Sequence, residues 1–466
     1  MTPDQEHLEK VDFDRISNLP NDILSLVLSC LSIRNATKTR LLSRRWRYLS
    51  PSSPLNIRFD PLTIFGVVCS MNWNNFFLQR KSKFIMVVNE SLHFHSGPKI
   101  DTLEVTFGLG IESQVHIDNW VSFALDKKTE RLSLDLSFYP EGADGCNFPC
   151  HILPYHGKPS HLKHLCLTAC ALAPSPEYAK RLSSLVTLSL TYVRLGEHQL
   201  ESILSACLNL ESLEFTSCSL PNNLCISGPS IPLKSLSVHF CFDFDRFKLN
   251  SLQKLVTFMY TGCMRKLVFA DVPSLEIVYF GHSASVRDYV LSQLGEDLHK
   301  LELLTLVFTP FDLLVIPKSM TTFRHLKQME LSISITPQYD LRGIMNFLNA
   351  FPALQKFQFN YRYDRYCFVE THRQVEFKQE PHFELREVEI FGFFGTSNEM
   401  DFVSCLLNCC IALKLLAVHS EGKIIFKPRG WKPRPNTSKH LNREAIQELF
   451  SQQKKVGTSG VEIIIS

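Results

Sequence analysis

The sequence predicts a mixed α/β chain in which a short helical module precedes a curved repeat solenoid and a closing α/β cap. Three observations support this prediction. Residues 13–52 are rich in leucine with helical periodicity, a strand-like phrase recurs through residues 99–380, and residues 381–466 end with a strand, helix and strand pattern. Residues 1–12 are expected to form a flexible tail, and residues 53–98 a linker with the first solenoid elements.

Residues 13–49 are expected to form three short helices. Leu19-Pro20 opens the first, because the fixed φ of proline fits the first helical turn and costs no backbone donor there. Helical spacing then runs through Ile23, Leu24, Val27, Leu28 and Leu31, and after a break through Ala36, Thr39, Leu42, Ser43 and Trp46. The stretch could be part of a larger core, but about forty residues cannot bury one alone. Some of these side chains therefore need a partner outside the segment.

The same residues resemble the F-box module. The segments DRISNLPNDIL, ATKT and LSRRWRYL, which begin at Asp14, Ala36 and Leu42, stand at the separations found in that family. Ser32 and Ser50 depart from its usual Pro and Trp, and both lie at element ends. The resemblance implies docking onto the Skp-type adaptor of a cullin-based (SCF) ubiquitin ligase. The adaptor-binding residues that it implies are Leu19, Pro20, Ile23, Leu24, Leu28, Leu42 and Trp46.

A phrase of the form L-x-x-L-x-L-x-x-C begins at residues 162, 185, 210, 233 and 255, at intervals of 22 to 25 residues. Strand alternation places Leu165 and Leu167 on one face and Cys166 on the other. The closing position holds Cys170, Cys218, Cys241 and Cys263, and Val193 in the remaining copy. These cysteines are expected to be reduced and buried, because a small thiol can fill the turn after each strand.

This period resembles leucine-rich repeats of the Cys-containing class, whose repeats are about 20–29 residues long. Stacked repeats bury a continuous apolar core and form a curved solenoid with a concave sheet. Looser copies are expected at residues 100–105, 275–280, 301–306, 326–331, 354–359 and 385–390. Helical convex segments are expected between strands, as at residues 200–207 and 348–357.

Residues 383–418 resemble the FBD region that ends many plant F-box proteins. The matching frame is a strand LREVEI, turn glycines Gly392 and Gly395, an acidic helix start, a helix FVSCLLNCC and a strand LKLLAV. A weaker resemblance continues with a helix at residues 441–453 and a strand at residues 461–465. From end to end the chain thus resembles a plant F-box/leucine-rich-repeat protein.

Composition and motifs exclude several classes of function. The chain has no secretory signal pattern at residues 1–12 and no apolar run long enough for a membrane span, so a membrane is not an expected partner. The formal net charge of +3 argues neither for nor against nucleic acid, which is not an expected partner either. Fifteen scattered cysteines are typical of reduced thiols in the cytoplasm and/or nucleus. The basic run KPRGWKPR, within the proline-rich residues 423–440, could be a recognition or import patch, although a solvated loop is the favoured interpretation.

Catalytic, metal and cofactor motifs are weak. His161 and His164 lack the further ligands of a zinc site. Cys146, Cys150 and His151 lie in a Gly/Pro-rich loop, and no C-x-x-C pair, P-loop or G-x-S-x-G follows. We therefore expect no catalytic residue, no metal, no cofactor and a non-catalytic component of a larger assembly.

The expected function is substrate recognition within an SCF-type ligase, with the repeats binding an unidentified protein substrate. Outward positions of the repeat strands, together with the aromatic residues that follow them, suggest the substrate-binding set Tyr192, Glu214, His239, Phe240, Met259 and Tyr279. Two alternatives stay open: a small-molecule, hormone-like receptor F-box protein, and an adaptor-independent scaffold. A receptor pocket would favour Arg and Lys, whereas these positions are mostly Ser, Thr and a few aromatics.

Overall fold

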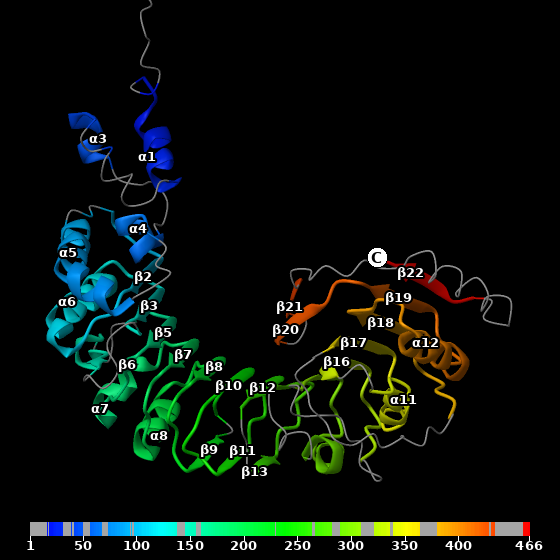
Figure 1. Cartoon of the computed structure of the whole chain (residues 1–466). Coiled ribbons are helices and arrows are strands. Elements are labelled where there is room, and N and C mark those ends of the chain that lie inside the picture. Colours follow the sequence, from blue (N-terminus) through cyan, green and yellow to red (C-terminus); the bar gives the residue numbers. More distant parts are fainter. Residues whose placement is uncertain are drawn as a thin grey trace, which may run out of the picture. The chain divides into compact units, whose positions relative to one another are not determined.

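Parallel β-strands with alternating apolar residues are the framework of the computed structural model, which is mixed α/β as predicted (Figure 1). The chain divides into two units, Met1–Leu185 and Val186–Ser466, and each is described by itself. The structure describes residues 16, 18–30, 39, 42–49, 56–67, 73–93, 95, 97–137, 145–154, 160–228, 230–262, 266–281, 289–308, 321–335, 339–363, 380–427, 430–433 and 460–466. The expected tail at 1–12 and the expected helix at 441–453 lie outside these residues.

The first unit begins with helices α1 (Asn21–Cys30) and α3 (Arg44–Tyr48); the expected helix between them falls almost entirely outside the described residues. The strands β1 (Asn56–Phe59), β2 (Thr102–Thr106), β3 (Arg131–Asp135) and β5 (His164–Thr168) then pair in parallel in that order. The remaining elements are α4 (Pro61–Phe65), α5 (Trp73–His93), η1 (Ile111–Ser113), α6 (Gln114–Asp126), β4 (Cys146–Asn147), η2 (Cys150–Ile152), β6 (Cys170–Ala171), α7 (Pro176–Ala179) and η3 (Lys180–Leu182).

Aromatic side chains fix the helices of the first unit against its strands. Phe84 of α5 stacks on Phe107 at the end of β2, with 4.1 Å between ring centroids, and both are buried. Trp120 of α6 donates a hydrogen bond from its indole nitrogen to Asn89 of α5 at 2.7 Å. This bond satisfies the only polar group of the indole, so the whole Trp120 side chain is buried without an unpaired hydrogen-bond donor.

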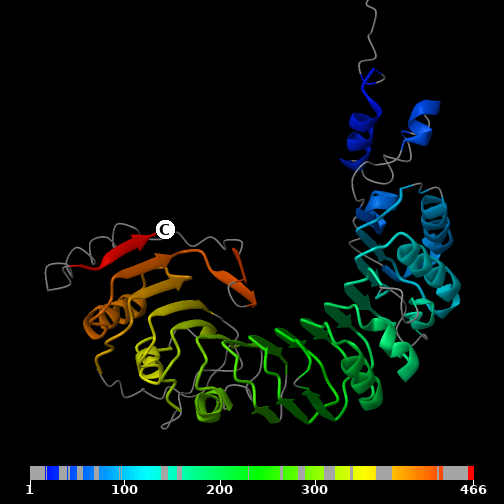
Figure 2. The same cartoon turned by 180° about the vertical axis from the view of Figure 1, so that it is seen from behind.

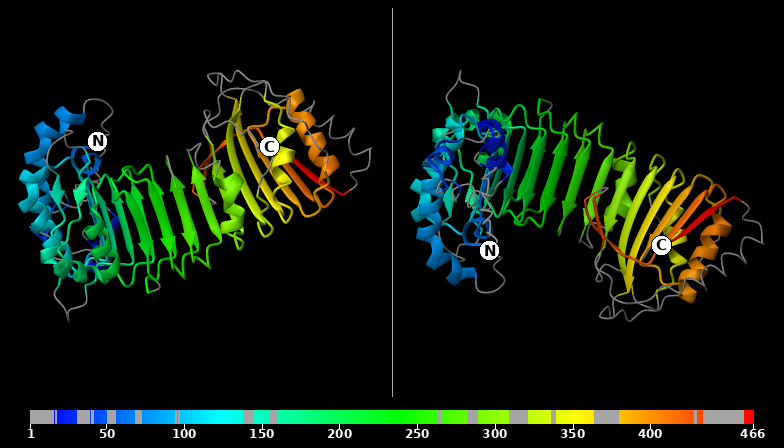
Figure 3. Two further views of the ribbon diagram at one scale, coloured as in Figure 1. Left: turned by 90° about the horizontal axis from the view of Figure 1, so that it is seen from below. Right: turned by 90° about the horizontal axis from the view of Figure 1, so that it is seen from above.

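The main sheet of the second unit continues the repeat pattern. Its strands lie side by side and parallel in the order β7 (Thr187–Thr191), β8 (Ser212–Thr216), β10 (Ser235–His239), β12 (Thr257–Thr261), β14 (Ile277–Gly281), β15 (Leu303–Val307), β16 (Gln328–Ile335), β17 (Lys356–Tyr363), β18 (Glu387–Phe391), β19 (Leu415–His419) and β22 (Glu462–Ile465) (Figure 3). These strands confirm the four strict repeat copies that begin at residues 185, 210, 233 and 255, and every looser copy from residue 275 on. β2 and β5 do the same in the first unit.

Burial alternates along these strands because successive side chains point to opposite faces. In β8, Leu213 and Phe215 are buried against the convex layer, whereas Glu214 between them is partly exposed on the opposite face, here called the inner face. The helices α8 (Glu197–Ala206), α11 (Gly343–Leu348) and α12 (Ser397–Cys409) lie on the other side of this sheet (Figures 1 and 2). Each fully buried Leu or Phe contributes about 2 kcal/mol, so the stacked repeats hold the core that no single repeat could bury.

The convex layer differs from the prediction in two places. The expected helical segment at residues 348–357 is wrong, because α11 ends at Leu348 and a turn containing Pro352 leads directly into β17. A second, three-stranded parallel sheet, unforeseen in the sequence, is made by β9 (Asn223–Ser227), β11 (Arg246–Asn250) and β13 (Lys266–Ala270). We call it the outer sheet. By contrast α8 confirms the expected helix, with Leu200, Ile203 and Leu204 buried.

The cysteine slot after the strands is occupied as expected. Cys170, Cys218 and Cys241 are buried free thiols, and Val193 is buried at the equivalent position. Cys263 lies outside the described residues. The Cys218 thiol donates to the Leu190 carbonyl at 3.2 Å, and the Cys218 amide donates to the Cys241 sulfur at 3.3 Å. The thiols thus link neighbouring repeats through their turns.

The C-terminal elements confirm the expected strand, turn, helix and strand. Gly392 and Gly395 have φ values of +85° and +81°, a conformation that suits glycine. Thr396 and Glu399 form a capping box at the start of α12. η4 (Val290–Leu294) and α10 (Gly295–Asp297) precede β15, and a hairpin of β20 (Lys423–Lys427) and β21 (Gly430–Pro433) follows β19.

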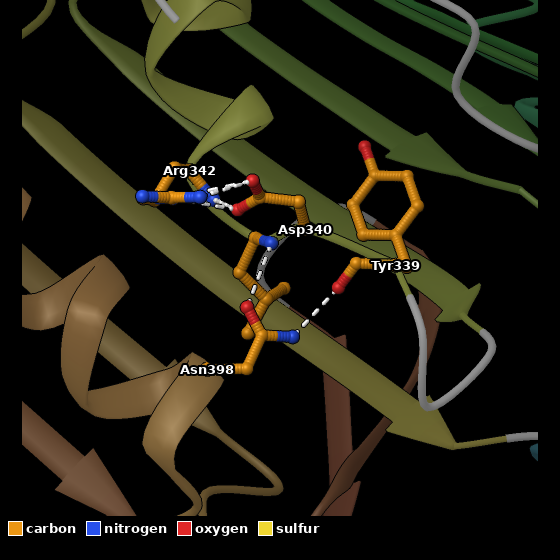
Figure 4. A network of polar contacts seen from close by, with 5 residues as sticks. Tyr339, Asp340, Arg342 and Asn398 are labelled. Carbon is orange, nitrogen blue, oxygen red and sulfur yellow. Dashed lines mark hydrogen bonds and ion pairs between the residues drawn. The ribbon is translucent and has the colours of Figure 1, made fainter. Parts of the chain in front are cut away.

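A polar network fixes α11 against α12 (Figure 4). Asn398 donates to the Tyr339 carbonyl at 2.6 Å and accepts from the Leu341 amide at 3.2 Å. Arg342, at the start of α11, pairs with Asp340 at 2.7 Å, and this guanidinium holds the pKa of Asp340 below its ordinary value. The Asn398 side chain of α12 thus supplies hydrogen-bond partners for two backbone groups of the segment before α11.

Candidate protein-interaction sites

The F-box module encloses a small core of its own. Leu24, Leu28 and Trp46 are buried together, with Leu19 and Leu49 packed against them. Ser43 caps α3 by accepting the Trp46 amide at 3.3 Å. Arg45 of α3 donates to Asn21 at 2.8 Å and also to the Leu19 carbonyl, so α3 is tied to the start of α1.

The predicted adaptor-binding residues fall into two groups. Leu24, Leu28 and Trp46 are buried inside the module, Leu24 completely, so these three form its core and are not part of its exposed surface. The reason is helical phase, because Leu24 and Leu28 lie one turn apart on the face of α1 that meets Trp46. Leu19 is half-buried against the same core.

The other predicted residues lie on the surface. Pro20 is exposed, Ile23 is 40% exposed and Leu42 is 69% exposed. The structure adds three exposed apolar residues that the predicted set lacked: Ile16, Leu26 and Val27. Ile23, Leu26 and Val27 lie at i, i+3 and i+4 on α1 and therefore share a face. We call Pro20, Ile23, Val27 and Leu42 the apolar contact set.

The inner face of the second unit brings Glu214, His239 and Met259 onto neighbouring strands. Their strands β8, β10 and β12 pair in sequence, and all three side chains are partly exposed. Glu214 accepts a hydrogen bond from Ser189 at 3.2 Å, and His239 shares one with Thr261 at 3.0 Å. Burial lowers the pKa of His239, which favours the neutral ring at neutral pH.

Tyr279 is a correction to the predicted substrate-binding set. It follows Met259 on the inner face but is only 1% exposed. Its ring lies over Gly281 of its own strand, where a Cβ would come within 2.9 Å of the tyrosine hydroxyl oxygen. Burial raises its pKa to about 12. The strand alternation that placed Tyr279 on this face was right, but a large side chain can fold down onto a neighbouring glycine.

Tyr192 and Phe240 are the most exposed members of the predicted set, at 62% and 54%. Each follows the last residue of its strand and has a positive φ, +54° and +51°. Their amides donate to the carbonyls of Thr216 and Thr261 at 3.0 and 2.7 Å, which continues the ladder past the strand ends. Phe242, two residues after Phe240, is also more than half exposed and was not in the predicted set. We call Tyr192, Phe240 and Phe242 the aromatic edge.

The left-handed backbone at this edge is energetically unfavourable for aromatic residues. A non-glycine residue there costs about 1 kcal/mol or more. The equivalent position after β12 is Gly262, which carries no such cost. The same turn position has a positive φ at Ala169 and Ser217, so the left-handed backbone belongs to the repeat. The exposure of two aromatic rings there is the feature that is typical of a binding surface.

The weak catalytic and metal motifs gain no support from the geometry. Burial raises the pKa of Cys146 to about 11 and that of Cys150 to about 12, which opposes the thiolate needed for nucleophilic attack. The Cys146 thiol donates to the Gly110 carbonyl at 2.9 Å. Within the described residues, no three His, Cys, Asp or Glu side chains gather as metal ligands, and no helix is both long and apolar enough to cross a bilayer.

The basic segment forms structure where a solvated loop was favoured. Residues 423–427 and 430–433 pair as the antiparallel strands β20 and β21, so the loop interpretation is wrong for these residues. Asn360 on the inner face grips the first of them, donating to the Lys423 carbonyl at 2.7 Å and accepting its amide at 3.0 Å. The Lys423 ammonium lies 3.7 Å from the centre of the Phe391 ring, and burial lowers its pKa.

Comparison with known proteins identifies the two parts of the chain. An F-box domain model matches residues 16–58, and a leucine-rich-repeat domain model described as At1g61320/AtMIF1 matches residues 91–454.

The relatives are Arabidopsis thaliana proteins. F-box protein At5g03100 is 29% identical over 281 residues, which cover 60% of this chain and 79% of that protein. F-box/FBD/LRR-repeat protein At1g13570 is 24% identical over 437 residues, 88% of this chain and 91% of that protein. Putative FBD-associated F-box protein At1g61330 is 23% identical over 463 residues, 94% and 97% of the two chains. Since the repeat match covers well over half of its length, the chain belongs to the At1g61320/AtMIF1 leucine-rich-repeat family and is a plant-type F-box/LRR-repeat protein.

Proposed function

We propose that this protein is the substrate-recognition subunit of an SCF-type ubiquitin ligase. The observation that carries the proposal is the apolar contact set, in which Pro20, Ile23, Val27 and Leu42 are exposed and lie outside the core that the described residues of the module form. The F-box match over residues 16–58 supports a Skp-type adaptor, and through it a cullin, as the partner. Exposed apolar side chains at this density are typical of an interface.

In this proposal the second unit binds a protein substrate at the aromatic edge and the adjoining inner face. Ubiquitin transfer is then carried out by a separate conjugating enzyme, which gains rate because the substrate lysine is held nearby. Such a complex would act in the cytoplasm and/or nucleus. The domain boundaries at residues 13–52, 53–98, 99–380 and 381–466 remain predictions within this scheme.

The inner face at β15, β16 and β17 favours a protein substrate over a small-molecule ligand. Thr305 and Glu330 are buried there, and the threonine hydroxyl donates to the carboxylate at 2.8 Å. Asn360 is also buried and donates to Ser332 as well as to the Lys423 carbonyl. These polar groups already bond to protein partners, so a ligand would have to displace those bonds.

Adaptor binding is the direct test. The full chain and a double variant, Ile23→Ser with Leu42→Ser, would be co-expressed with a Skp-type adaptor and purified through the adaptor. Losing an apolar anchor at an interface costs about 2 kcal/mol, so we expect the double variant to bind roughly thirtyfold more weakly or worse. The matched control is Val115→Ser with Ile411→Ser, two exposed apolar residues outside the F-box. Undiminished adaptor binding by the Ile23/Leu42 variant would contradict the proposal.

A further inference from the structure

The outer sheet presents one face to the core and one to solvent. Its three strands are in register, so that Asn223, Arg246 and Lys266 form one row across them and Cys225, Lys248 and Val268 form the next. Phe247 and Leu249 of the central strand are completely buried and hold the sheet against the repeat core. Arg246 and Lys248, which alternate with them, therefore point outward.

Three cations gather on this outward face. Arg246 and Lys266 are directly opposite each other on neighbouring strands, at a spacing of about 4.8 Å, and Lys248 is two residues along the central strand. None of the three forms an ion pair among the described residues, and none of the nine outward positions of the sheet is acidic. Asp243 and Asp245 precede the central strand, and Asp271 follows β13. The carboxylate of Asp243 accepts a hydrogen bond from Ser219 and that of Asp271 accepts one from Gln253, each at 2.7 Å.

Like charges on adjacent strands destabilise a sheet, so these cations do not help the protein to fold. We propose that this face, defined by Arg246, Lys248 and Lys266, binds an acidic, extended segment of a protein partner. Carboxylates would neutralise the three cations together, which removes their mutual repulsion on binding. This face shares no residue with the apolar contact set or with the aromatic edge.

Two features favour an acidic peptide over nucleic acid. The outward positions carry no aromatic side chain on which a base could stack. In the part of the chain that the structure describes, β9 and β13 are the edge strands of this sheet, each paired with a strand on one side only. An extended peptide can use such an edge, with alternate acidic side chains facing the cations.

Cys225 of the edge strand β9 provides a reporter directly beside this face. It is exposed and lies in register with Lys248, whereas Cys166 is only partly exposed on β5. The full-length protein would be treated with a maleimide in the presence of a peptide of about ten glutamates, longer than one strand of the sheet. Peptide mass spectrometry would then give the labelling rate at Cys225, with Cys166 as the internal reference. We expect selective protection of Cys225 that weakens as salt is raised to about 150 mM.

The variant Lys248→Glu with Lys266→Glu should require about tenfold more peptide for the same protection. Its matched control is Lys300→Glu with Lys414→Glu, which makes the same change in net charge at two exposed lysines elsewhere in the second unit. Thermal unfolding of both variants would verify that the repeats stay folded. Absence of protection, equal loss in the two variants, or stronger protection by a single-stranded oligonucleotide of equal charge would each overturn the proposal.

Discussion

The small residue that closes each repeat shows how a single side chain determines local structure. Cys218 is completely buried, and its thiol and amide bond to groups of the repeats on either side. A thiol fits because it is small, weakly polar and able to donate to a carbonyl. Val193 fills the equivalent slot by size alone. Because the same small slot recurs in each repeat, Cys recurs at the same position of the sequence pattern.

A charge in this slot has no partner. We expect Cys218→Asp to lower the free energy of unfolding by about 3 kcal/mol or more, the usual effect of an unpaired buried charge. Denaturant titration followed by circular dichroism would measure it. Cys225→Asp makes the same chemical change at an exposed cysteine and should stay within about 0.5 kcal/mol of the parent protein. Equal stability of the two variants would show that the slot tolerates water or a charge.

At the scale of elements, His382 connects three parts of the second unit: the turn before β17, the segment before β18 and the end of α12. Its Nδ1 accepts the Leu385 amide at 3.2 Å, so the proton is on Nε2, which donates to the Phe351 carbonyl at 2.9 Å. Backbone bonds with Cys409 and Ile411 add a third connection. Burial lowers the pKa of His382 below its ordinary 6.5, because the charged ring would be desolvated.

A lowered histidine pKa makes stability depend on pH in a definite direction. Between the folded pKa and 6.5 the unfolded chain binds more protons, so stability is fully present above 6.5 and is lost as pH falls toward the folded pKa. We expect the parent protein to lose more unfolding free energy between about pH 7.5 and pH 5 than a His382→Gln variant does. His164, His239 and His419, whose pKa values are also lowered, are present in both proteins and cancel in the difference. Equal losses would assign the acid sensitivity to other groups.

The elements that the sequence predicted share a simple pattern. Strands such as β8 alternate polar and apolar residues, and α12 begins with the Thr396/Glu399 capping box, so local chemistry and tertiary context agree. The outer sheet was not predicted although Leu224 and Ile226 alternate with polar or exposed residues, because five residues of alternation in a convex segment are a weak strand signal by themselves. The end of α11 at Leu348 depends on a turn that helical spacing alone does not reveal.

At the scale of the molecule, the sequence located both candidate surfaces but not which side chains are available on them. In the F-box it grouped Leu24 with Ile23, and only the position of α3 separates core from surface. On the inner face it grouped Tyr279 with Tyr192, although the Tyr279 ring is buried and lies over Gly281. Exposure in both cases depends on packing between residues distant in the sequence, which periodicity does not encode.

The aromatic edge carries the prediction that tests the protein as a recognition subunit. Tyr192 and Phe240 are more than half exposed and sit on unfavourable backbone, so removing their rings forfeits little packing. We therefore expect Tyr192→Ala with Phe240→Ala to keep thermal stability and adaptor binding, while substrate affinity falls roughly thirtyfold or more, as for a lost pair of interface anchors. Quantitative mass spectrometry of proteins captured under proteasome inhibition would measure the loss. Phe383→Ala with Leu208→Ala removes two equally exposed apolar residues elsewhere in the second unit and should leave the captured set unchanged. If the aromatic variant also captured an unchanged set, substrate binding would have to lie elsewhere in the chain, because the rings that most resemble binding anchors would then be dispensable.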